Sequence, residues 1–71
     1  MAEPTFLRLR GEFGVLRRTG LSRSTVYLRM KEGRFPKPVP LDGSAVAWVE
    51  SEISQWIADR VKAARPETVA A

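Results

Sequence analysis

The first apolar residues of the chain alternate with charged ones. Leu7 and Leu9 are separated by Arg8 and followed by Arg10, so successive side chains change from apolar to basic. A period of two is typical of a strand with one buried face and one exposed face. The pattern predicts a short strand over residues 6–10.

The apolar spacing then changes to that of a helix. Over residues 12–19, three apolar residues can line one side of a two-turn helix, namely Phe13, Val15 and Leu16. Gly11 and Gly14 lower the helix propensity by about 1 kcal/mol each, so tertiary packing has to stabilise this helix. Gly20 ends it, because a glycine just past the last periodic residue readily takes the left-handed conformation.

A second helix is predicted between Ser22 and Gly33. The Ser22 hydroxyl is placed to accept a hydrogen bond from a free backbone N–H of the first turn, and Gly33 closes the helix. Val26 and Met30 fall on one side of this helix, and four residues fall roughly opposite: Ser24, Tyr27, Leu28 and Lys31. A purely structural helix rarely exposes a tyrosine and a leucine beside basic residues, so we expect this face to contact a partner.

A β-hairpin is predicted after the second helix. Prolines at three positions between residues 34 and 40 exclude a helix there and favour an extended edge segment. Asp42-Gly43 is a strong turn signal between the apolar residues of 39–41 and those of 45–48. These residues therefore predict two short antiparallel strands.

The last predicted element is a helix that begins near Glu50 and ends before Pro66. Glu50 and Glu52 suit the positive end of its dipole, which is a more ordinary role for two acids than general acid–base catalysis. Its apolar residues recur at helical spacing: Ile53, Trp56, Ile57, Val61 and Ala64. Trp56 lies on this stripe and Trp48 ends the hairpin, so we interpret both tryptophans as core anchors.

Length and composition limit what the chain can be. Its 71 residues form one domain, which we expect to span residues 6–64 with flexible termini at 1–5 and 65–71. The absence of cysteine and histidine excludes thiolate and imidazole metal sites and the common nucleophile–base pairs, so we expect no catalytic residues, no metal, no cofactor and no enzyme. No apolar run could span a bilayer and no signal segment opens the chain, so we expect a cytoplasmic protein without membrane contact.

Charge is distributed unevenly along the chain. The formal net charge is +4, but residues 8–37 alone carry nine basic and two acidic residues, a net charge of +7. The rest of the chain is acidic overall. A concentrated basic segment predicts a polyanionic partner such as nucleic acid.

The order of the predicted elements is that of a winged helix-turn-helix, in a fold that is mainly α with a small β-hairpin. The major groove of duplex DNA, about 12 Å wide, admits one α-helix, and side chains near its N-terminus reach base edges. We therefore expect the second helix and the basic segment after it to bind DNA. The predicted site comprises Ser22, Arg23, Ser24, Thr25, Tyr27, Leu28, Lys31, Arg34 and Lys37.

Three blocks of sequence are more specific than a general helix-turn-helix pattern. They are TGLSRSTVY at residues 19–27, GRFPKPV at 33–39 and VAW at 46–48. Together they resemble the AlpA family of phage-type DNA-binding regulators. The resemblance implies a MerR-like, excisionase-like winged helix-turn-helix that acts on prophage or mobile-element DNA, with the start of its recognition helix at Ser22 to Tyr27.

The chain departs from the family pattern at two places. Family members enter the first helix with a compact Leu-Pro-Glu-type segment, whereas residues 10–14 here read Arg-Gly-Glu-Phe-Gly. Members also often carry an arginine near the hairpin tip, where this chain has Asp42-Gly43-Ser44. An aspartate is repelled by the negative potential of a narrow minor groove, so Arg34 and Lys37 are expected to contact phosphates instead.

Three functions are open at this point. The first, which we favour, is a transcription regulator, and the second is an architectural excision factor that bends DNA for a recombinase. The third is an adaptor whose exposed helix face, with Tyr27 and Leu28, meets an acidic protein. Expected partners are double-stranded DNA and either a recombinase or the transcription machinery. No heptad seam is present, so we expect a monomer or a weak dimer that forms on DNA or through the last helix.

Overall fold

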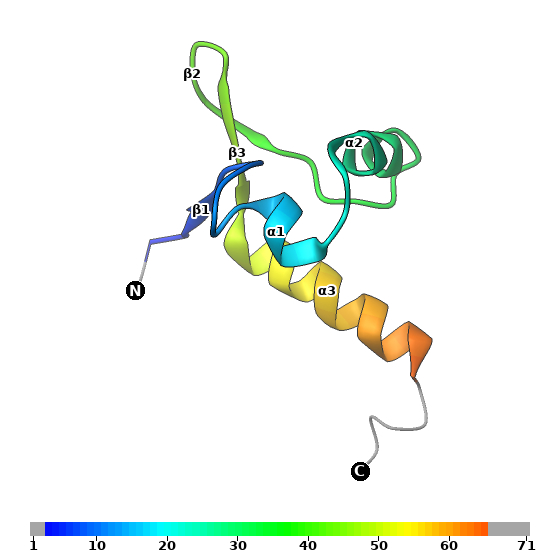
Figure 1. Ribbon diagram of the computed structural model, residues 1–71. Coiled ribbons are helices and arrows are strands. Elements are labelled where there is room, and N and C mark those ends of the chain that lie inside the picture. Colours follow the sequence, from blue (N-terminus) through cyan, green and yellow to red (C-terminus); the bar gives the residue numbers. More distant parts are fainter. Residues whose placement is uncertain (1–2, 66–71) are drawn as a thin grey trace.

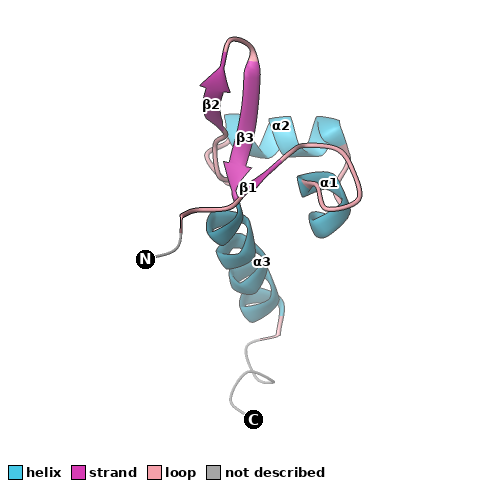
Figure 2. Cartoon of the chain, turned by 90° about the vertical axis from the view of Figure 1, so that its left-hand side faces the viewer, coloured by secondary structure: helices cyan, strands magenta, loops and turns pink. Residues whose placement is uncertain are grey.

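Three helices and a small antiparallel sheet make up the computed structural model, which describes residues 3–65 (Figure 1). In chain order the elements are β1 (Phe6–Leu7), α1 (Val15–Thr19), α2 (Arg23–Lys31), β2 (Val39–Asp42), β3 (Ala45–Val49) and α3 (Glu50–Ala64). The β2–β3 hairpin projects from one side of the molecule and α3 extends from the other (Figures 1 and 2). The predicted combination of helices with a small hairpin is confirmed, and β1 adds a third strand to the sheet.

β3 is the central strand of the sheet, with β1 and β2 on either side. Both neighbours are antiparallel to it, and the pairing places Leu7 opposite Trp48 and Val39 opposite Ala47. Gly43 turns the hairpin with a φ of 55°, a left-handed conformation that glycine adopts without steric cost. The hairpin that Asp42-Gly43 predicted is therefore confirmed.

The chain between β1 and α1 differs from the prediction. We expected a strand to residue 10 and a helix from residue 12, but β1 ends at Leu7 and α1 begins only at Val15. The carbonyl of Arg8 accepts a hydrogen bond from the Val15 N–H at 2.8 Å, and the carbonyl of Leu9 accepts one from the Leu16 N–H at 3.0 Å. These two carbonyls accept hydrogen bonds from free N–H groups at the start of α1 and therefore do not pair with a neighbouring strand. The same two bonds fix the turn between β1 and α1.

Phe13 and Gly14 have different positions from those that the helical pattern predicted. Phe13 lies in the turn before α1 with 76% of its surface exposed, so it does not line the buried side of that helix. Gly14 is buried at the N-cap of α1, and a Cβ added there would lie 2.4 Å from the Arg10 carbonyl oxygen. A glycine is required at this position because the backbone of Arg10 and Arg8 passes too close to leave room for a side chain.

Gly14→Ala is expected to lower the free energy of unfolding by about 1–3 kcal/mol, which is the usual cost of adding a carbon atom to a well-packed site. The added Cβ would meet the backbone of Arg10 and of Arg8, which cannot swing aside as a flexible side chain can. Urea unfolding followed by circular dichroism measures the loss. Glu12→Ala in the same turn is the control, since its exposed side chain should change stability by less than about 0.5 kcal/mol. A Gly14→Ala protein as stable as the wild type would show that the turn can shift.

α2 begins and ends where the local signals predicted. The Ser22 hydroxyl accepts a hydrogen bond from the Thr25 N–H at 3.2 Å, which confirms Ser22 as the N-cap. At the other end, the Arg34 N–H donates to the Arg29 carbonyl at 2.8 Å and the Gly33 N–H donates to the Met30 carbonyl at 3.1 Å. This pair of bonds, with Gly33 at a φ of 75°, is a Schellman motif.

α3 packs against the rest of the molecule only through its first half. Ile53 is fully buried, Trp56 and Ile57 are half-buried, and every described residue from Ala58 onward is exposed. The apolar stripe predicted to continue through Val61 and Ala64 is therefore uncovered in its second half, where α3 extends past the other elements (Figure 1). The predicted stop at Pro66, like the termini at 1–2 and 66–71, lies outside the described residues. In the part that is described, no helix has the length and apolarity needed to cross a membrane.

A single core joins the sheet to all three helices. Its buried residues are Leu7, Val15, Val26, Phe35, Ala47, Trp48 and Ile53. Trp48 is 0% exposed, and its indole N–H donates to the Pro36 carbonyl at 2.9 Å, which confirms it as a core anchor. Because Val26 is the fully buried residue of α2, the core holds that helix with its polar face outward.

Candidate nucleic-acid interface

The exposed face of α2 carries most of the residues that the sequence predicted for DNA binding. Tyr27 is 42% exposed and Leu28 is 51% exposed, on a helix whose opposite face is closed by Val26. Arg23, Ser24 and Lys31 are exposed on the same helix. The structure thus brings Arg23, Ser24, Tyr27, Leu28 and Lys31 onto one accessible helix, as the helical spacing predicted.

Tyr27 and Arg23 contact each other along this face. The guanidinium carbon of Arg23 lies 5.4 Å from the centre of the Tyr27 ring, within the range of a cation–π interaction. The two residues are one helical turn apart, which places one side chain over the other. The tyrosine ring therefore supports the arginine at the leading end of α2 and does not cover the core.

Ser22 and Thr25 lie at the start of α2 and contact each other. Their hydroxyl groups share a hydrogen bond of 2.9 Å, in addition to the capping bond that Ser22 accepts from the Thr25 N–H. Thr25 is half-buried. Both hydroxyls are thus engaged within the helix start, and their role in the described structure is to fix where α2 begins.

Arg34 and Lys37 do not lie on α2. Arg34 follows its end and lines a small hollow together with Arg29 and Arg60. Lys37 is exposed in the segment that leads from α2 to β2. The structure therefore divides the nine predicted residues among the start of α2, its exposed face and the segment after it.

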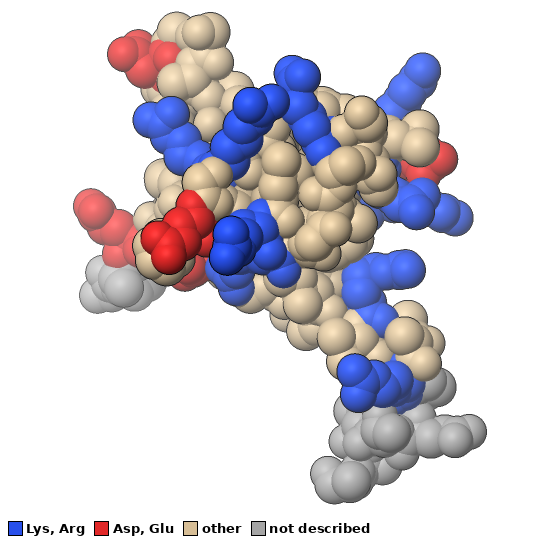
Figure 3. All heavy atoms as spheres, viewed as in Figure 1, with Lys and Arg blue, Asp and Glu red and all other residues tan. Residues whose placement is uncertain are grey.

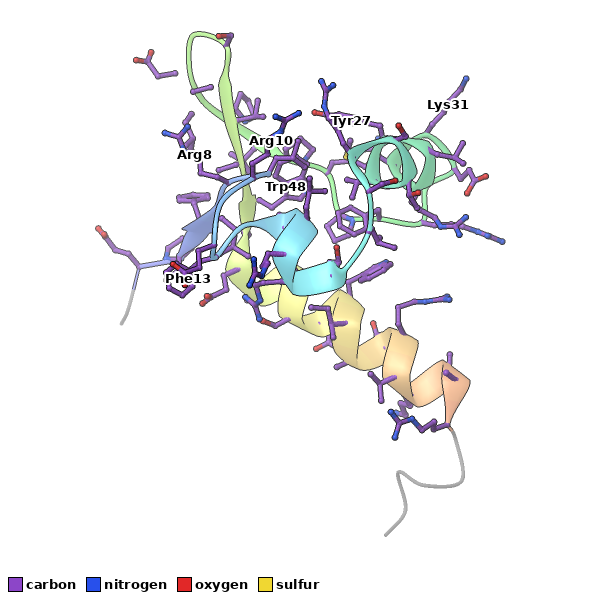
Figure 4. The ribbon with its side chains drawn as sticks, viewed as in Figure 1. Arg8, Arg10, Phe13, Tyr27, Lys31 and Trp48 are labelled. Carbon is purple, nitrogen blue, oxygen red and sulfur yellow. The ribbon has the colours of Figure 1, made fainter. Side chains whose placement is uncertain are left out.

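Arg8 and Arg10 are two residues that the predicted site omitted. Both are exposed, and their side chains point toward the upper side of the molecule, as do Tyr27 and Lys31 (Figure 4). Lys and Arg side chains gather along this side from the base of the hairpin across to α2, while acidic side chains lie around its edges, at the hairpin tip, at the left and at the far right (Figure 3). The alternation of Leu7 and Leu9 with two arginines was the sequence signal that could have identified them: although β1 ends at Leu7, the two leucines are buried or half-buried and both arginines are exposed.

The ion pairs of the described residues do not neutralise the basic side chains on this side of the molecule. Arg18 pairs with Glu50 at 3.4 Å and Arg29 pairs with Glu32 at 3.2 Å. Within residues 3–65, no carboxylate lies within ion-pair distance of Arg8, Arg10, Arg23 or Lys31. The same range holds no cluster of three or more residues that could ligate a metal ion. Four positive side chains are thus available to an anionic partner.

A helix pair joined by the tight turn at Gly20, followed by a hairpin, defines the molecule as a small winged helix-turn-helix domain. The family model described as "Prophage CP4-57 regulatory protein (AlpA)" matches residues 5–61. The chain belongs to this AlpA family.

Two relatives support this assignment. The uncharacterised protein ORF88 of Enterobacteria phage P4 is 47% identical over 47 residues, which is 66% of this chain and 53% of that protein. The DNA-binding transcriptional activator AlpA of Escherichia coli K12 is 39% identical over 54 residues, 68% of this chain and 77% of that protein. The chain thus spans about half the length of the phage relative. No solved structure matches the chain.

Proposed function

We propose that this protein is a phage-type transcription regulator that binds duplex DNA by placing α2 in the major groove, without catalytic activity. The observation that carries the proposal is the exposed, basic face of α2, flanked by Arg8 and Arg10 and without acidic partners in the described structure. Membership of the AlpA family supports it, as does the relative from E. coli described as a DNA-binding transcriptional activator.

The dimensions of α2 suit this role. Its nine residues give a length of about 13 Å at 1.5 Å per residue, and its exposed face is free of covering elements. Arg23 and Ser24 at the leading end can reach base edges, and Leu28 can contact the methyl group of a thymine. Lys31 and Lys37 are assigned to backbone phosphates, which set the position of the helix along the duplex.

The hairpin has a different part in this proposal. Asp42 at its tip is exposed, and a carboxylate there is repelled by the negative potential of the minor groove. We therefore assign the hairpin no insertion into the groove. The segment at its base, with Lys37, provides the contact to the backbone instead.

Arg23→Ala and Lys31→Ala test the proposal because they remove two kinds of contact. Lys31→Ala should weaken binding to all duplexes alike and reduce the slope of log affinity against log salt by about 0.9, as the loss of one phosphate contact does. Arg23→Ala should lower affinity for the specific site by about 1–3 kcal/mol and relax the preference at one base pair. Fluorescence anisotropy with a selected duplex and a scrambled duplex, over a series of salt concentrations, separates the two effects.

Lys62→Ala is the matched control for both variants. Lys62 is exposed on the uncovered half of α3, so its loss changes the net charge without touching the proposed interface. If Arg23→Ala, Ser24→Ala and Lys31→Ala all bind DNA as the wild type does, α2 does not enter the groove. Binding of the same helix face to an acidic protein, without binding to DNA, would then support the adaptor function.

A further inference from the structure

A small hollow lined by three arginines lies where α2 and α3 meet. Its volume is about 120 Å³, and its lining residues are Leu21, Arg29, Arg34, Trp56 and Arg60. No acidic residue lines it. The three arginines that line it come from three different segments of the chain, namely α2, the loop after it, and α3.

The backbone of Arg34 is fixed at this hollow from two directions. Its N–H donates to the Arg29 carbonyl at 2.8 Å, and its own carbonyl accepts from the Trp56 indole N–H at 2.7 Å. The Trp56 ring also meets Phe35 edge to face, with 4.8 Å between the ring centres. α3 thus positions Arg34 beside the end of α2, and the hollow is built by the fold instead of by flexible side chains alone.

The charges at the hollow are only partly compensated. Arg29 pairs with Glu32 at 3.2 Å, whereas the Arg60 guanidinium lies over the Trp56 ring, 6.0 Å from its centre. In the described range, no carboxylate is within ion-pair distance of Arg34 or Arg60. Arg34 and Arg60, which have no acidic partner in this range, favour binding of an anion, and their planar guanidinium groups match the oxygen geometry of a phosphate.

We infer that this three-arginine hollow binds one backbone phosphate of duplex DNA; the inference rests on the proposed function. Around α2, at 100° per residue, Arg23 and Arg29 lie about 60° to either side of the buried Val26, so they stand at the two edges of the exposed face. A helix seated in the major groove has the backbone of one strand along each flank. Arg8 and Arg10 then contact the backbone of one DNA strand, and the hollow binds a phosphate of the other DNA strand.

The size and charge of the hollow favour a phosphate over an acidic protein segment. Its volume of about 120 Å³ is well below the roughly 300–1,000 Å³ of pockets for drug-sized ligands, so the hollow suits one small oxyanion group. It also lies in the part of the molecule where the basic segment ends, beside residues already assigned to DNA. A carboxylate of a protein partner is the alternative occupant that the experiment has to exclude.

Arg60→Gln tests the inference in DNA binding. Arg60 is exposed, so the variant should fold as the wild type does, which circular dichroism verifies. We expect the slope of log affinity against log salt to fall by about 0.9 on specific and scrambled duplexes alike. Lys62→Gln, two residues along the same helix, removes the same charge outside the hollow and should leave the slope unchanged.

Inorganic phosphate provides a direct test of the hollow without DNA. Trp56 lines the hollow, whereas Trp48 is fully buried elsewhere in the core, so a change in tryptophan fluorescence reports on Trp56. We expect a saturable change on titration with phosphate in the wild type, none with chloride at equal ionic strength, and none in Arg60→Gln. Absence of a saturable change in the wild type would overturn the site.

Two further outcomes are distinguishable. If phosphate binds but Arg60→Gln leaves the DNA salt slope unchanged while Lys31→Ala lowers it, the hollow serves another anion and the assignment to DNA is overturned. If Lys31→Ala also leaves the slope unchanged, and Arg23→Ala and Ser24→Ala bind DNA as the wild type does, the proposed function fails, independently of the phosphate titration.

Discussion

Trp48→Ala is expected to unfold the domain. Replacing a fully buried large aromatic residue with alanine costs about 3–5 kcal/mol, and domains of this size have a net stability of only a few kcal/mol. Trp48 is 0% exposed and pairs with Leu7 across the sheet, and its loss would also leave the Pro36 carbonyl without the indole N–H. Thermal unfolding followed by circular dichroism should show no cooperative transition at room temperature or above.

Trp56→Ala is the matched comparison, because it removes the same side chain from a half-buried position. The variant loses the edge-to-face contact with Phe35 and the hydrogen bond to the Arg34 carbonyl, but it opens no enclosed cavity. We therefore expect a smaller loss of stability and a retained cooperative transition. A near-native melt of Trp48→Ala, or a larger loss in Trp56→Ala, would contradict this ranking of the two tryptophans.

The sequence predicted best those elements whose limits are set by local chemistry. Ser22 and Gly33 set the two ends of α2 through hydrogen bonds to neighbouring backbone groups, and Asp42-Gly43 turns the hairpin through its own backbone conformation. Each of these signals acts within a few residues, so the sequence contains it completely.

Positions that depend on tertiary contacts were not predicted. Phe13 fits a helical pattern, but α1 begins only at Val15, where the carbonyls of Arg8 and Leu9 accept hydrogen bonds from its first N–H groups. The spacing of apolar residues does not reveal this contact. Val61 continues the apolar stripe of α3, yet no described element extends far enough to cover it. Periodicity identifies the side of a helix that can be buried, but only the packing of other elements decides how much of it is.

The same distinction applies to the candidate site. The exposed face of α2 follows from the helical spacing of Tyr27, Leu28 and Lys31, and it was predicted. The meeting of Arg34 with Arg60, some 26 positions later in the chain, depends on the hydrogen bond from Trp56 and was not. Arg8 and Arg10 were recognised as basic, but their direction toward the side that carries α2 depends on the turn before α1.

Exchanging both Arg8 and Arg10 for glutamine is expected to weaken DNA binding about a hundredfold at low salt. A hydrogen bond to a charged group makes a net contribution of about 1.5–3 kcal/mol. The loss of two phosphate contacts therefore lowers the binding free energy by at least about 3 kcal/mol. Both arginines point to the side that presents Tyr27 and Lys31, and neither has an acidic partner in the described structure. Counterion release predicts that the slope of log affinity against log salt falls by about 1.8.

The carbonyls of Arg8 and Leu9, not their side chains, cap α1, so the double variant should keep the stability of the wild type. Arg17→Gln with Lys62→Gln is the control, because it removes the same charge from exposed positions on α1 and α3 that the proposed interface does not include. We expect the control to keep nearly the wild-type slope. If both double variants lower the slope equally, the effect of Arg8 and Arg10 is one of net charge, and the interface is confined to α2. A difference of about two phosphate contacts between them would instead mean that the turn before α1, where this chain departs from its family's pattern, holds one strand of the duplex against the recognition helix.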